Sequence, residues 1–106
     1  MNQYVINSLS VPTFLEPEYD SHKSFYHKAF TRIDPITQRE ILYSYDTPII
    51  ALDADGSLHP LLPESSLDLY SRTTGRHVKE FVAQRTDCLN FNKAAYKKLL
   101  EKEGKY

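Results

Sequence analysis

The spacing of apolar residues changes once along this chain, and that change constrains the fold more than any other feature. Between residues 40 and 52, every second position carries a strand-forming side chain on one face: Ile41, Tyr43, Tyr45, Thr47 and Ile49. Val78, Phe81 and Val82 recur instead at intervals of three and four, the spacing of one helix face. Strands followed by helices predict an α+β fold, with the helices packed on one face of the sheet.

Three strands are expected, joined as an antiparallel meander, so the predicted order is βββαα. The first strand covers Phe25–Ile33, and the second and longer one covers Glu40–Leu52. Asp53-Ala54-Asp55-Gly56 forms a tight turn, and a short third strand follows over Leu58–Leu62. Pro48 cannot donate a ladder hydrogen bond, so it predicts an edge position or a bulge in the second strand.

Two helices are expected after the strands. Ser71 is a good N-cap for a helix from about Arg72 to Gln84, and Thr73 is the competing cap. Asn92 caps a second helix, which runs to about Glu103. The predicted core draws on both layers and consists of Phe25, Ala29, Ile41, Tyr43, Ile49, Val78, Phe81, Val82, Tyr96 and Leu99.

A chain of 106 residues has the size of one domain. Residues 24–106 are expected to form this domain, and residues 1–23 an extended N-terminal arm, because proline and acidic residues around Pro17 resist regular structure. Apolar residues such as Val5 and Ile6 either pack the arm onto the domain or wait for a partner to order it.

The composition narrows the class of protein. The net charge of −1 gives no overall attraction to nucleic acid or to an acidic membrane. The single cysteine, Cys88, cannot form a disulfide within the chain. The N-terminal residues lack the basic and apolar regions of a signal peptide, and no apolar run reaches membrane-spanning length. A cytoplasmic protein with no membrane partner is therefore predicted.

Catalytic and metal-binding patterns receive little support. One cysteine, Cys88, and one histidine, His77, are weak evidence for a catalytic pair. A structural role for the thiol is therefore favoured over nucleophilic catalysis. The segment Asp53-Ala54-Asp55-Gly56 resembles the start of a calcium loop, but the apolar residues after it lack the required oxygen ligands. No enzyme activity, metal or cofactor is expected.

The start of the first predicted helix breaks an electrostatic preference. A helix N-terminus is the positive end of the backbone dipole, yet Arg72, Arg76 and His77 lie there. Free backbone N–H groups attract anions, so the cluster predicts a site for a nucleic-acid phosphate or a partner's carboxylate. Alternatively, acidic residues such as Asp68 neutralise the arginines, and His77 hydrogen-bonds within the fold. The candidate binding residues are Arg72, Thr73, Arg76, His77, Tyr45 from the tyrosine-rich strand and Lys97 from the lysine-rich last helix.

Three segments carry a resemblance to a known family. They are Phe25-Tyr26-His27-Lys28-Ala29, the Ser-Tyr-x-Thr motif within residues 42–49, and the Ser-x-Thr-Thr-x-Arg-His motif from Ser71 to His77. Together they resemble small uncharacterised domains of bacteriophages and other mobile elements, over roughly residues 24–100. The resemblance implies a mobile-element origin and a βββα core, and no chemistry. His27 departs from the pattern, where glycine is usual.

Two functions from different classes follow. The first is a non-enzymatic phage or mobile-element interaction protein that binds and modulates a host or defence protein, with an anti-CRISPR inhibitor as one version. The second is a small nucleic-acid-binding module that uses residues 71–77 and the basic last helix. Salt dependence separates the two, because phosphate contacts release counterions.

Overall fold

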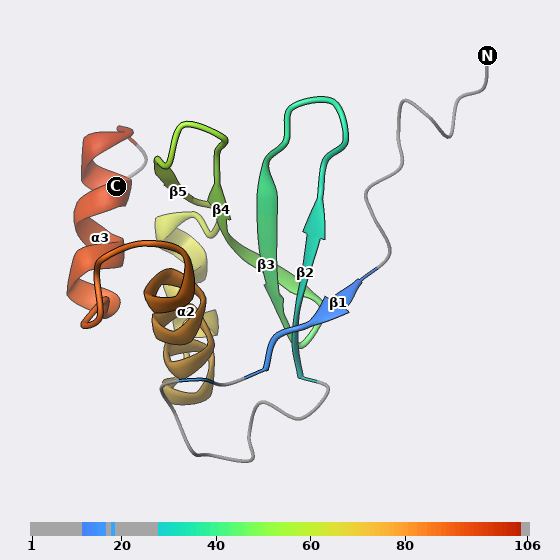
Figure 1. Cartoon of the computed structure of the whole chain (residues 1–106). Helices are drawn as coiled ribbons and strands as arrows, with labels where there is room; N and C mark the ends of the chain where they lie inside the picture. Colours follow the sequence, from blue (N-terminus) through green and yellow to red (C-terminus); the bar gives the residue numbers. More distant parts are fainter. Residues whose placement is uncertain (1–11, 17, 19–27, 105–106) are drawn as a thin grey trace.

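A computed structural model describes residues 12–16, 18 and 28–104 of the chain (Figure 1). Its strands form a five-stranded sheet in the order β1-β2-β3-β4-β5, and all neighbours pair antiparallel. The elements are β1 (Thr13–Phe14), β2 (Ala29–Ile33), β3 (Glu40–Ser44), β4 (Thr47–Leu52), β5 (Leu58–Pro60), the 3-10 helix η2 (Glu64–Leu69), α2 (Arg72–Arg85) and α3 (Lys93–Lys102). The α+β class is confirmed, whereas the three-stranded meander is wrong because the sheet has five strands.

One of the additional strands arises because the predicted strand Glu40–Leu52 is in fact a hairpin. The chain reverses between Ser44 and Thr47, which face each other in the register of β3 and β4. Tyr45 and Asp46 make the turn with φ of 51° and 71°. Positive φ at both central residues belongs to the tight hairpin turn that normally uses Asn-Gly. Neither residue here is glycine, so the sequence carries no turn signal.

A bulge in the same hairpin decides which residues enter the core. Leu42 pairs with Ile50 while Tyr43 pairs with Pro48, so Ile49 is an extra residue on β4. The bulge predicted from Pro48 is confirmed. The bulge allows two consecutive residues, Ile49 and Ile50, both to be buried; they are 1% and 0% exposed.

The core otherwise follows the prediction in the helices more closely than in the strands. Ala29, Ile49, Val78, Phe81, Val82 and Tyr96 are confirmed as buried, and Leu99 is partly buried against them. Ile41 and Tyr43 are only half-buried, because alternation from the buried Leu42 directs them to the other face of β3. Phe25 lies outside the described residues, as does the start of the first predicted strand.

The segment predicted as an arm contributes to the sheet where the structure describes it. Thr13 and Phe14 pair with Thr31 and Phe30 of β2, and Leu15 is 4% exposed within the core cluster. Val5 and Ile6 lie outside the described residues.

Both predicted helices and their caps are confirmed. The Ser71 hydroxyl accepts from the Thr74 N–H at 3.1 Å, and the Asn92 side chain accepts from the Ala95 N–H at 2.9 Å. Helix α2 packs on β3 and α3 on β5, so both lie on the same side of the sheet (Figure 1). Helix η2, which the sequence analysis does not predict, connects β5 to α2. Neither α2 nor α3 is long and apolar enough to cross a membrane.

The hairpin turn provides a test of the backbone geometry. We expect Asp46→Gly to raise the free energy of unfolding by about 0.5–1 kcal/mol, because glycine removes the left-handed strain at φ 71° and loses only part of that gain to chain entropy. Asp55→Gly is the matched control in the next turn, where the Asp55 carboxylate accepts from the Ser57 N–H at 3.0 Å. That variant should be less stable than wild type by about 0.5–1.5 kcal/mol. Urea unfolding measures both changes, and a destabilised Asp46→Gly would contradict the turn assignment.

Candidate functional site

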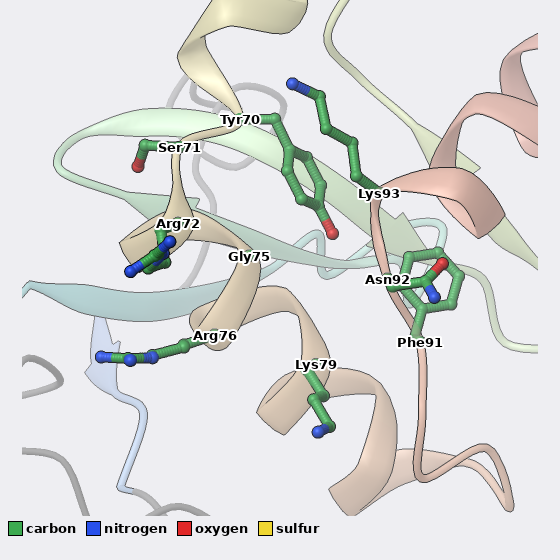
Figure 2. A pocket seen from close by; sticks show the side chains of 9 residues that line it. All are labelled: Tyr70, Ser71, Arg72, Gly75, Arg76, Lys79, Phe91, Asn92 and Lys93. Carbon is green, nitrogen blue, oxygen red and sulfur yellow. The ribbon is translucent and has the colours of Figure 1, made fainter.

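The starts of α2 and α3 meet around a pocket of about 370 Å³ (Figure 2). The α2 side supplies Tyr70 and the cap Ser71, followed by one face of the helix; the α3 side supplies Phe91, Asn92 and Lys93. Neither helix has an acidic residue in its first turn. The pocket therefore lies beside two positive helix ends with no side-chain carboxylate in either first turn to balance them.

Four cations line this pocket, and we call them the pocket cations: Arg72, Arg76, Lys79 and Lys93. The first three are spaced i, i+4 and i+7, which places them along one face of α2. Among the residues that the structure describes, none forms an ion pair with any of the four. The internal neutralisation that the sequence left open, by residues such as Asp68, is therefore not seen.

Two arginines elsewhere in the fold have carboxylate partners, whereas Arg32 lies over the rings of Phe30 and Tyr43. Arg39 contacts Asp53 at 2.6 Å, and this hydrogen bond holds the pKa of the Asp53 carboxyl below its usual value. Arg85 binds Glu40 through two nitrogens, at 2.7 and 3.0 Å. Arg72 and Arg76 differ from Arg39 and Arg85 because neither has a carboxylate partner among the described residues.

The apolar part of the pocket is formed by Tyr70 and Phe91, which are 5% and 6% exposed. Gly75 makes room for the Tyr70 ring, because a Cβ atom there would lie 3.2 Å from the ring. The Tyr70 hydroxyl is buried and has no hydrogen-bond partner in the described part of the chain. Burial, with a smaller contribution from Tyr96, raises the pKa of this phenol, so the hydroxyl keeps its proton. A buried donor without an acceptor is uncommon and calls for an explanation.

A buried polar cluster connects β3 to α2. The Ser44 hydroxyl lies 2.8 Å from Nδ1 of His77 and 3.0 Å from the Thr74 hydroxyl, and all three side chains are buried. These contacts join the Ser-Tyr-x-Thr and Ser-x-Thr-Thr-x-Arg-His motifs through residues that are 30 and 33 positions apart in sequence. The two motifs therefore fasten the β3–β4 hairpin to α2.

Glu80 extends the buried polar layer along α2. Its carboxylate accepts from the backbone N–H of Glu18 at 2.9 Å and from the Gln84 side chain at 2.7 Å. Glu80 is 2% exposed. The contact with Glu18 attaches α2 to the segment that precedes β2, so Glu80 has a structural role.

The structure brings together only part of the predicted binding set. Arg72 and Arg76 line the pocket, with Arg72 exposed and Arg76 half-buried. His77 does not join them, because it is 0% exposed and bonded to Ser44. Thr73 and Lys97 belong to the same two helices but do not line the pocket. Tyr45 is 51% exposed at the hairpin turn, with its ring centroid 5.9 Å from that of His77.

Sequence reasoning missed four lining residues that matter for the chemistry: Tyr70, Lys79, Phe91 and Lys93. Lys79 follows Arg76 by three positions on the same helix face, and this spacing is visible in the sequence. Lys93 directly follows the cap Asn92, so it repeats the pattern of Arg72 after Ser71. The position of Tyr70 in the pocket has no sequence signal, because it depends on the path of the chain from η2 into α2.

The other candidate chemistries are not assembled in the described residues. Cys88 is an exposed thiol, while His77 is enclosed in the core. Asp55 bonds to Ser57 within its own turn. Within residues 12–16, 18 and 28–104, no group of three or more His, Cys, Asp or Glu side chains is placed to hold a metal ion.

Comparison with known proteins places the chain in a family. The model of the family of unknown function DUF8033 matches residues 13–102, so the chain belongs to that family. The match runs from β1 to the end of α3 and includes every residue that lines the pocket. No curated protein and no solved structure matches the chain.

Proposed function

We propose that this protein acts by binding, without catalysis, and that the pocket between the starts of α2 and α3 receives an acidic group of a partner protein. The observation that carries the proposal is the set of pocket cations without ion-pair partners among the described residues. Like charges on one helix face repel each other. Each cation near a helix N-terminus also lowers the free energy of unfolding by roughly a few tenths of a kcal/mol. A set that opposes stability in this way fits a role in recognition.

A protein partner is favoured over nucleic acid by the extent of the cationic surface. The pocket cations all line one local site, and the chain as a whole has a net charge of −1. Nucleic-acid modules usually present a basic face that follows several phosphates. A protein carboxylate or similar group needs only the local site.

Nucleic acid is the second candidate because of one feature of α3. Lys93 and Lys97 are four residues apart, so the positive charge at the pocket continues along that helix. Binding of this kind would weaken steeply as salt concentration rises.

The class of partner can be proposed from the family that the sequence motifs resemble. We propose a host or defence protein in the cytoplasm of the host cell, with an anti-defence inhibitor as one version. The support is the resemblance to domains of phages and mobile elements together with the small size of the chain, 106 residues.

The test is a pair of double variants compared as baits in pull-downs from candidate host cells. Arg72→Gln with Arg76→Gln should reduce recovery of the partner at least tenfold, because it removes two cations from the pocket. Lys98→Gln with Lys102→Gln removes two α3 cations that do not line the pocket and should leave recovery within twofold of wild type.

The stability of the same variants separates recognition from structure. Since Arg72 and Arg76 have no ion-pair partner among the described residues, their double variant should unfold within about 0.5 kcal/mol of wild type, or be more stable. A large loss of stability, or equal recovery by both double variants, would contradict the proposed site. Loss of recovery after nuclease treatment would favour the nucleic-acid candidate.

A further inference from the structure

We propose that His59 is a proton-dependent link between the sheet and the end of α3: the charged imidazole fastens the last turn of the helix, and the neutral imidazole releases it. His59 is the middle residue of β5, and Glu103 is the C-cap of α3, which packs on that strand (Figure 1). The link lies at the opposite end of α3 from the pocket, so this inference does not depend on the proposed function.

Both ring nitrogens of His59 face a carboxylate. Nδ1 lies 2.6 Å from Oε2 of Glu103, and Nε2 lies 2.8 Å from Oδ2 of Asp53. A neutral imidazole has one N–H and one lone pair, so it donates to only one of these oxygens and turns its lone pair toward the other. The imidazolium has two N–H groups and donates to both. The observed arrangement is therefore that of the charged ring.

The charges around His59 come from three other parts of the chain. Asp53 and Asp55 belong to the β4–β5 turn, and Asp55 is close enough to interact electrostatically with the ring. Arg39, which precedes β3, contacts Asp53 at 2.6 Å, and Glu103 comes from α3. Three carboxylates thus face two cations when His59 is charged. When His59 loses its proton, Arg39 is the one cation of this group that remains, and repulsion among the carboxylates increases.

The contact with Glu103 is the one that opens when the ring is neutral. Asp53 stays near His59 because Ala51 pairs with His59 and Leu52 with Leu58 in the β4–β5 ladder. Glu103 is 44 positions away from His59 in sequence and lies at a helix end, where the backbone frays most readily. Movement of the last turn of α3 therefore relieves the repulsion without disturbing the sheet.

The link should weaken as pH rises through the range in which histidine changes its charge, about pH 5 to 8. The side chains of His59 and Glu103 are 29% and 22% exposed, so protons exchange with the pair without unfolding of the domain. The last turn of α3 is then attached to β5 on the acidic side of this range and detached on the alkaline side. Acidification orders one helix end, while the core keeps its packing.

Amide hydrogen exchange of the full chain at pH 5.5 and 8, expressed relative to the intrinsic exchange rate at each pH, measures this opening. The reporters are the N–H groups of Glu103 and Gly104, which close the last turn of α3. Their protection should fall at least threefold from pH 5.5 to pH 8. Protection of the Tyr96 N–H, in the first turn of the helix, should change less than twofold. His59→Gln should show the lower protection of the last turn at both pH values.

Two carboxylate variants identify the contact. Glu103→Gln should abolish the pH dependence as His59→Gln does, whereas Glu101→Gln should keep it, because the exposed Glu101 forms no ion pair among the described residues. Nitrogen chemical shifts of the His59 ring should show both nitrogens protonated at pH 5.5. Equal protection of wild type at the two pH values, or a pH dependence that persists in Glu103→Gln, overturns the inference. If His59→Gln fails to fold, the comparison of the two glutamate variants decides the question alone.

Discussion

Phe81→Ala should lower the free energy of unfolding by about 3–5 kcal/mol, the cost of truncating a buried aromatic side chain. Phe81 is 0% exposed and lies on the face of α2 that packs against the sheet. The substitution leaves a cavity at the junction of the helix and sheet layers. It also removes the ring over which the Arg85 guanidinium lies, 4.5 Å from the ring centroid. Urea denaturation with a fluorescence or circular dichroism signal measures the change.

Lys79→Ala is the control on the same helix. Its side chain is exposed and has no ion-pair partner among the described residues, so the free energy of unfolding should change by less than about 0.5 kcal/mol. If Phe81→Ala cost less than about 1 kcal/mol, α2 would have to face the sheet with a different side.

The helices could be predicted from sequence because their signals are local. Ser71 and Asn92 are side chains that cap a helix through a hydrogen bond three residues on, and both make that bond. The apolar spacing of Val78, Phe81 and Val82 then fixes which face of α2 is buried. Each of these features is encoded within a few residues, so tertiary structure has little opportunity to override it.

The strands were harder to predict because their geometry depends on pairing partners. Tyr45 and Asp46 adopt positive φ without glycine or asparagine, so the reversal between β3 and β4 left no trace in the composition. The bulge at Ile49 then shifts the alternation by one residue. Such a shift breaks the regular alternation on β4, where Ile49, Ile50 and Ala51 are all buried.

The candidate site shows the same division between local and tertiary information. Arg72 and Arg76 could be predicted because their position at a helix start breaks a local rule. Lys93 joins them only because α3 begins beside α2, a placement set by the packing of α3 on β5. His77 was expected beside the arginines, but the helical twist directs it inward to Ser44. The charge pattern thus predicts where the candidate site lies, whereas the packing of the helices determines which residues line it.

Tyr96 is expected to be the most important hydrogen-bonding side chain of the core. Its hydroxyl donates to the Ile49 carbonyl at 2.6 Å and accepts from the N–H groups of Leu61 and Leu62 at 3.1 and 2.9 Å. The Leu61 N–H also reaches the Ile49 carbonyl at 2.9 Å, so it keeps a partner without the phenol. Tyr96→Phe therefore leaves the Leu62 N–H without this acceptor and should cost about 1–3 kcal/mol at pH 7. Tyr45→Phe, at the exposed turn, should cost less than about 0.5 kcal/mol.

The same phenol predicts how stability changes in alkali. Burial raises the pKa of Tyr96 from 10.0 to about 12, whereas the unfolded chain releases the phenolic proton near pH 10. The contribution of this group to stability is complete below pH 10 and is lost as pH rises from 10 through 12, because the unfolded state then binds fewer protons. Urea unfolding at pH 7, 9 and 10.5 should show wild type losing more free energy of unfolding at pH 10.5 than Tyr96→Phe does. Parallel losses in the two proteins would mean that the Tyr96 hydroxyl ionises as readily in the folded state as in the unfolded chain, which is incompatible with its enclosure between β4, β5 and α3.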